Sequence, residues 1–232
     1  MRWFNLVTLT VFYVLVDISS AFADDDDIYS FILGDRLEYQ PNGDTWVWDA
    51  EGWIGGDYHK AWVKTEGDKA NGQTGEVELQ LLYSRAVLPF FDLQLGVRHD
   101  FEPYPTRTFA VVGLQGLAPQ WIELDIAAFV SEDGDFSMRL ELEYDLLLTQ
   151  RLTIQPRIEF DLAAQKVAEQ QVGKGLTSTE LGVRLRYEVR REFAPYIGVT
   201  WRKTYGGTKT FLEAEGERDD TVSFVAGVRF WF

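Results

Sequence analysis

Apolar and polar residues alternate with a period of two along most of this chain. The last segment, 221–232, illustrates the pattern, because its even positions are all apolar, whereas its odd positions include Thr221, Ser223, Gly227 and Arg229. Such alternation predicts β-strands with two different faces. The clearest apolar face, opposed by Arg139, Glu141, Glu143 and Asp145, consists of Met138, Leu140, Leu142, Tyr144 and Leu146.

The alternating segments are longer than the strands of most soluble proteins, which average about five or six residues. A strand that crosses a membrane needs about 9–11 residues. One apolar face and one charged face suit a barrel with lipid outside and a polar lumen. We therefore predict an all-β fold, a twelve-stranded antiparallel transmembrane outer-membrane β-barrel, rather than a soluble β-fold. The predicted strands are 30–40, 44–54, 58–67, 74–87, 89–101, 106–117, 119–131, 135–148, 150–163, 177–190, 194–206 and 219–232.

The predicted connections alternate in length, as they do in bacterial barrels with short periplasmic turns and longer outer loops. Short turns are expected at 55–57, 88–89, 118–119, 149–150 and 191–193. The longer loops are expected at 67–73, 102–105, 131–134, 164–176 and 207–218. This places both chain ends in the periplasm. The terminal Phe232 is typical of strands that the outer-membrane assembly machinery recognises.

Aromatic residues gather near the ends of the predicted strands, which suggests girdles at the two membrane interfaces. A set of core aromatics in a soluble β-fold is the alternative. The girdle candidates are Tyr83, Phe90, Phe91, Phe101, Tyr104, Phe109, Trp121, Phe129, Tyr196, Trp201 and Tyr205.

The first 23 residues are typical of a signal peptide. Arg2 precedes an apolar stretch, which closes on the A-x-A pattern of Ala21-Phe22-Ala23. A short acidic leader is expected at 24–29, followed by the barrel at 30–232. An amphipathic first helix is the alternative interpretation of the first segment.

Composition excludes several classes of function. The chain has no cysteine, so it has no disulfide framework, thiolate metal site or cysteine nucleophile. It carries 22 Lys and Arg against 37 Asp and Glu, a formal net charge of −15. Nucleic acid, which requires a basic surface, is not an expected partner.

Several blocks of residues carry a family resemblance that covers about 31–232. In these blocks the chain resembles the outer-membrane copper resistance protein B family. The blocks are Trp48–Tyr58, Trp62–Gly67, Glu76–Ala86, Gly113–Pro119, Ala127–Gly134, Tyr144–Leu152, Arg190–Tyr196 and Phe224–Phe232. The resemblance implies a Gram-negative outer-membrane barrel in copper homeostasis, with outer-membrane lipid around it. It also implies a periplasmic copper protein, such as a multicopper oxidase, as a partner.

The chain departs from the family in its metal ligands. Many family members carry a Met- and His-rich segment between signal peptide and barrel, whereas here the interval holds aspartates. The whole chain contains only Met1, Met138, His59 and His99 as thioether or imidazole ligands. His59 and His99 are expected at opposite ends of the barrel. A soft or imidazole copper site with three or four ligands is therefore not expected within one copy.

Charged residues on the predicted lumen face are the remaining candidates for metal contact. Loosely bound copper, held by carboxylate oxygens, is the one inorganic cofactor that we consider, and no organic cofactor is expected. The six candidate metal-contacting residues are Glu141, Glu143, Asp145, Glu159, Asp161 and Glu188. A structural lattice of ion pairs is the alternative, because unpaired buried charge is costly. The two roles can coexist, and such a lattice predicts a lumen that is plugged at rest.

The predicted function is that of a non-enzymatic outer-membrane barrel that passes or sequesters copper ions. A general small-solute pore, or a structural barrel without copper specificity, is the alternative. An acyl hydrolase at the rim would need a serine beside His99, and no serine lies convincingly opposite it.

Overall fold

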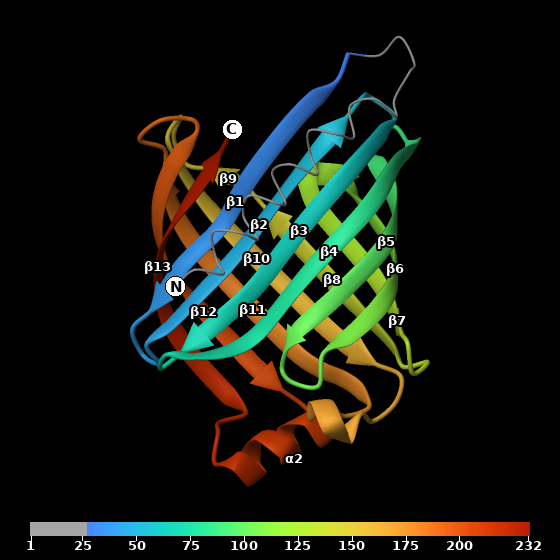
Figure 1. Cartoon of the computed structure of the whole chain (residues 1–232). Helices are drawn as coiled ribbons and strands as arrows, with labels where there is room; N and C mark the ends of the chain where they lie inside the picture. The colour runs from blue at the N-terminus through green and yellow to red at the C-terminus, as the bar shows by residue number, and fades with distance from the viewer. Residues whose placement is uncertain (1–26) are drawn as a thin grey trace, which may run out of the picture.

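The computed structural model describes residues 27–232, which form a closed antiparallel barrel (Figure 1). Strands that follow one another in the chain are paired, and β1 pairs with β13 to close the barrel. The short β9 continues β8 beyond Asp145, and both pair with β10. The barrel therefore has twelve strands, as predicted. The predicted signal peptide at 1–23, and positions 24–26 of the leader, lie outside the described residues.

All strands except β9 contain between 9 and 16 residues, which is the length a tilted membrane-crossing strand requires. They are β1 (Tyr29–Gln40), β2 (Thr45–Gly55), β3 (His59–Ala70), β4 (Gln73–Leu88), β5 (Phe91–Glu102), β6 (Arg107–Ala118), β7 (Ile122–Ser131), β8 (Phe136–Tyr144), β9 (Leu146–Leu147), β10 (Leu152–Ala163), β11 (Gly175–Tyr187), β12 (Phe193–Thr204) and β13 (Asp220–Trp231).

The two ends of the barrel differ. One end, here called the terminal end, holds the start of β1, the end of β13 and short connections that include η2 (Pro119–Trp121). The other end, here called the loop end, holds η3 (Ala168–Gln170) and α2 (Gly206–Glu215), which fill the two longest connections (Figure 1). The predicted loop at 67–73 is wrong. There, β3 and β4 continue to a tight Asn71-Gly72 turn, where both residues adopt positive φ.

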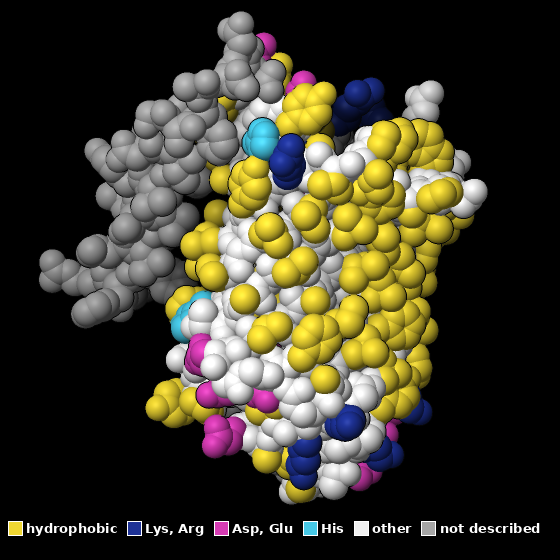
Figure 2. Space-filling view, turned by 90° about the vertical axis from the view of Figure 1, so that its right-hand side faces the viewer, with side chains coloured by type: hydrophobic (Ala, Val, Ile, Leu, Met, Phe, Trp, Pro, Cys, Tyr) yellow, Lys and Arg dark blue, Asp and Glu magenta, His cyan; other side chains and the backbone are white. Residues whose placement is uncertain are grey.

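Apolar side chains form a band across the face of the barrel that Figure 2 shows, and charged side chains gather above and below this band. The exposed side chains Leu81, Val97, Val183, Ile197 and Phe224 belong to this outer surface. Exposed apolar side chains at alternate strand positions suit contact with lipid. No helix among residues 27–232 is long and apolar enough to cross a membrane.

The lumen holds charged side chains along most of the wall and an apolar cluster along one part of it. The cluster consists of Trp62, Leu82, Phe109, Val111 and Phe129. The girdle prediction is therefore wrong for Phe109 and Phe129, and also for Tyr196, whose hydroxyl donates to Glu38 inside the barrel. In β6, the residues on both sides of the strand near Phe109 are apolar, so periodicity alone could not show whether Phe109 points into the lumen or outward.

A β-bulge in β1 changes which of its residues face the lumen. The register shifts between Gly34 and Arg36 against β2, and between Gly34 and Leu37 against β13. Asp35 contacts Arg229 of β13, and the next residue, Arg36, contacts Asp49 of β2. Two successive charged residues thus enter the lumen, which a regular strand cannot achieve.

Candidate functional site

The lumen contains two compartments, one towards each end of the barrel. The loop-side compartment has a volume of about 140 Å³ and is lined by residues that include Glu76, Asp161 and Arg202. The terminal-side compartment has a volume of about 510 Å³ and is lined by residues that include Glu51 and Glu123. Three residues line both compartments: Glu66, Glu78 and Arg139. We call these three residues the shared layer.

Carboxylates outnumber cationic side chains in both compartments. The terminal-side compartment is lined by ten carboxylates and by three cationic residues, Lys64, Arg139 and Arg229. The loop-side compartment is lined by seven carboxylates and by three arginines. A wall with such an excess of negative charge around a small polar space concentrates positive ions. The lumen is therefore built to attract cations.

Arg157 forms ion pairs with three of the candidate residues on β8 and β10. Its side chain is 1% exposed and lies within 2.7 Å of Glu141 and 2.5 Å of Glu159. Glu143 lies 3.1 Å from the same guanidinium and also accepts a hydrogen bond of 3.0 Å from Gln155. Three of the six predicted metal-contacting residues thus surround one buried arginine, which confirms the predicted ion-pair lattice.

The other three candidates lie apart from Arg157. Asp161 accepts hydrogen bonds from Arg139 at 3.2 Å and from Ser178 at 2.7 Å, and it lines the loop-side compartment. Asp145 pairs with Arg186 at 2.5 Å, near the terminal end. Glu188 follows the last residue of β11 and lines neither compartment, so the structure does not join it to the others.

Several lumen residues were not among the sequence candidates. Arg36 lies 2.5 Å from Glu66 and 3.6 Å from Glu180, and it joins β1, β3 and β11 across the lumen. Glu180 has the same parity as Arg184 in β11, and Glu66 has the same parity as Lys64, so alternation could have identified both. The bulge hides the parity of Arg36. Arg202 is followed directly by Lys203, so the charges of this strand do not alternate.

Lysine and aromatic side chains shape the terminal-side compartment. Lys64 Nζ lies 2.6 Å from Asp125 and 4.0 Å from Glu51, and it also lies over the Trp62 ring. Lys60 forms a similar pair with Asp92 at 2.9 Å.

Glu123 lines the terminal-side compartment and Glu76 lines the loop-side compartment, and neither forms an ion pair with any residue in 27–232. These two carboxylates therefore stand outside the ion-pair lattice, although Arg202 acts on Glu76 and Arg229 acts on Glu123 at longer range.

The two histidines lie at opposite ends of the barrel and face outward. His59, at the start of β3, stacks on the exposed Tyr83, with its Nδ1 2.5 Å from the Tyr83 hydroxyl. His99, near the end of β5, lies with its Nδ1 2.9 Å from Oγ1 of Thr108. Within residues 27–232, no group of three or more His, Asp or Glu side chains is arranged to hold a metal ion.

Comparison with known proteins assigns the chain to a family. The family model described as copper resistance protein B precursor matches residues 28–232. The chain belongs to the copper resistance protein B family. It is 49% identical over 210 residues to copper resistance protein B of Escherichia coli. The aligned region covers 90% of this chain and 71% of the relative. It is 40% identical, with the same coverage, to a copper resistance protein B homolog of Pseudomonas syringae pv. tomato (strain ATCC BAA-871 / DC3000).

The fold of this copper resistance protein B family member is also found in a solved porin. The NanC porin superposes with a TM-score of 0.56 and 16% identity, covering 87% of this chain and 99% of the porin. At that identity the likeness concerns the fold. It agrees with the closed twelve-stranded barrel.

Proposed function

We propose that the protein lies in the outer membrane of a Gram-negative bacterium and admits copper ions into its acidic lumen, without catalysing a reaction. The observation that carries this proposal is the excess of carboxylates over cationic side chains in both compartments. The relatives are named for copper resistance, which supports copper as the cargo. In this proposal the terminal end faces the periplasm, where a copper protein such as a multicopper oxidase exchanges the ion.

Charge and ligand chemistry both favour divalent copper over other small solutes. The low-dielectric barrel wall strengthens the field of its carboxylates, which raises the local concentration of cations. Among first-row divalent ions, Cu²⁺ binds a given set of oxygen ligands most strongly. Copper is therefore expected to bind the lumen wall more tightly than Zn²⁺ does.

Glu76 and Glu123 provide a test that leaves the ion-pair lattice intact. Because neither forms an ion pair within the described residues, Glu76→Gln/Glu123→Gln lowers the charge of both compartments without breaking an ion pair of the lattice. Glu169→Gln/Glu217→Gln is the matched control, since these two exposed glutamates lie in loop-end connections and line neither compartment.

The experiment is growth of a copper-sensitive host that produces each full-length variant, across a series of copper concentrations. We expect the wild type and the surface control to alter copper tolerance equally, and the lumen variant to alter it less. Equal effects of all three proteins would contradict copper passage through the lumen. An identical response to zinc and magnesium would instead favour a general small-solute pore.

A further inference from the structure

The two lumen compartments meet at only a few side chains. Of the residues that line them, Glu66 on β3, Glu78 on β4 and Arg139 on β8 are the three that they share. The two compartments therefore border each other at this shared layer, beside the ion pairs of Arg36 and Arg157. An ion that crosses directly from one compartment to the other passes this layer.

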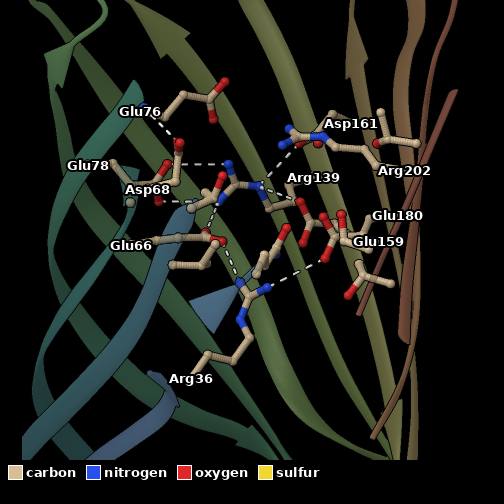
Figure 3. Close-up of a pocket in the computed structure, with 17 residues that line it drawn as sticks. Arg36, Glu66, Asp68, Glu76, Glu78, Arg139, Glu159, Asp161, Glu180 and Arg202 are labelled. Atoms are coloured by element: carbon tan, nitrogen blue, oxygen red, sulfur yellow. Dashed lines mark hydrogen bonds and ion pairs between the residues drawn. The ribbon is translucent and has the colours of Figure 1, made fainter. Parts of the chain in front are cut away.

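Arg139 extends across the lumen to reach the other two residues of the layer. Strand β8 is hydrogen-bonded to β7 and β10, not to β3 or β4. The Arg139 guanidinium nevertheless lies 3.0 Å from Glu66 and 3.2 Å from Glu78. Figure 3 shows the side chain reaching from its own strand towards both glutamates, with Asp161 on its other side. A single arginine therefore bridges opposite walls of the barrel.

The glutamates of the layer are also anchored to their own side of the barrel. Glu66 pairs with Arg36 at 2.5 Å, and Glu78 pairs with Arg98 at 2.8 Å. Neither Arg36 nor Arg98 lines both compartments. Arg139 is thus the one cationic residue among the three that separate the compartments. Its guanidinium both fills the space and repels any cation that approaches.

We propose that Arg139 is the stopper of the lumen, and that without its side chain the two compartments join into a cation-selective path. The closure itself does not depend on copper, but its role in controlling copper passage rests on the proposed function. When the guanidinium is removed, the layer retains two carboxylates, so the opened path favours cations over anions.

The test is single-channel recording of the purified full-length protein in planar lipid bilayers, with potassium chloride at unequal concentrations on the two sides. The wild type is expected to remain closed. Arg139→Ala is expected to conduct, with a reversal potential shifted towards the potassium equilibrium potential. Arg98→Ala is the matched control, because it also removes an arginine from Glu78 but lines neither compartment. It is expected to remain closed.

A second variant protects the test against failure to fold. Arg139→Ala/Glu66→Gln/Glu78→Gln removes the carboxylates that the single substitution leaves under-paired, and it is expected to conduct with weaker cation selectivity. Heat-modifiable gel mobility reports folding of each variant. The proposal is overturned by a folded Arg139→Ala protein that stays closed, by an open wild type, or by equal conductance of Arg98→Ala. Failure of both Arg139 variants to fold would also overturn it, since Arg139 would then be a purely structural residue.

The outcome separates this inference from the proposed function. Conductance through Arg139→Ala, together with unchanged copper tolerance in Glu76→Gln/Glu123→Gln, would support the stopper and contradict copper passage. A closed Arg139→Ala protein, together with altered copper tolerance in the lumen variant, would contradict the stopper and leave the proposed function standing.

Discussion

Arg184 donates a hydrogen bond of 2.5 Å to Glu38. The bond joins β11 to β1 inside the barrel, next to the place where β1 pairs with β13. The two side chains are 3% and 1% exposed, and Tyr196 donates to the same carboxylate oxygen at 3.1 Å. The strands between them are β12 and β13, and β13 pairs with β1 to close the barrel. This buried ion pair therefore fastens the two ends of the sheet.

Glu38→Ala is expected to destabilise the barrel strongly, because it leaves the Arg184 guanidinium buried and unpaired. The expected loss in the free energy of unfolding is about 3–5 kcal/mol. Urea unfolding followed by tryptophan fluorescence measures it. The double variant Glu38→Ala/Arg184→Ala is expected to lose less than the sum of the single variants. Additive losses would show that the two residues stabilise the barrel independently.

The loop contact between Asp135 and its two donors is expected to weaken only in acid. Hydrogen bonds from Gln165 and Arg107 lower the pKa of the Asp135 carboxyl below its ordinary value of 3.8. Because the pKa is lower in the folded state, the contact contributes stability above pH 3.8 and loses it as the pH falls through the folded-state pKa. Carbon NMR titration measures that pKa, and Gln165→Ala should raise it. A wild-type pKa at or above 3.8 would contradict this assignment.

Removal of both histidines is expected to leave copper binding unchanged. His59 and His99 lie on the outer surface at opposite ends of the barrel, so neither contributes to the acidic lumen. His59→Ala/His99→Ala should bind Cu²⁺ within about twofold of the wild type in a calorimetric titration, a difference of less than 1 kcal/mol. A tenfold or larger loss would place copper on the outer surface, between copies of the chain.

Phe129 and Phe224 are expected to differ in their contribution to stability. Phe129 is 2% exposed inside the lumen and lies under the Arg98 guanidinium, at 4.8 Å from ring centroid to Cζ. Phe129→Ala should therefore cost about 3–5 kcal/mol in the free energy of unfolding. Phe224 is 63% exposed on the outer band, and Phe224→Ala should cost less. The reverse order in urea unfolding would mean that the inward and outward faces are misassigned.

The twelve strands were predictable because alternation is a local signal. In β8 and β10, nearly every apolar residue is followed by a polar or charged one, so the side-chain periodicity defines both faces and the strand length. The predicted tenth strand ran three residues beyond Tyr187, because Glu188, Val189 and Arg190 continue the alternation into a turn. Helix α2 was predicted as part of a loop, although Gly216 ends it with a positive φ.

The partners of the lumen charges were not predictable in the same way. Arg139 meets Glu66 and Glu78 across the barrel, and those contacts depend on the strand tilt and the size of the barrel, which no local pattern specifies. Arg36 enters the lumen only because of the bulge beside it. Opposite charges on β8 and β11 indicated a lattice, but the closed barrel decides which pairs form.

The measurement that most directly tests the central claim is a calorimetric titration of the purified full-length protein with Cu²⁺, with Mg²⁺ as the control ion. Glu76→Gln/Glu123→Gln is the informative variant. Neutralising Glu141, Glu143 and Asp145 would instead leave Arg157 and Arg186 under-paired. We expect saturable Cu²⁺ binding that is tighter than Mg²⁺ binding and weaker in the variant. Copper binding no tighter than that of magnesium, or unchanged in the variant, would contradict a lumen that admits copper.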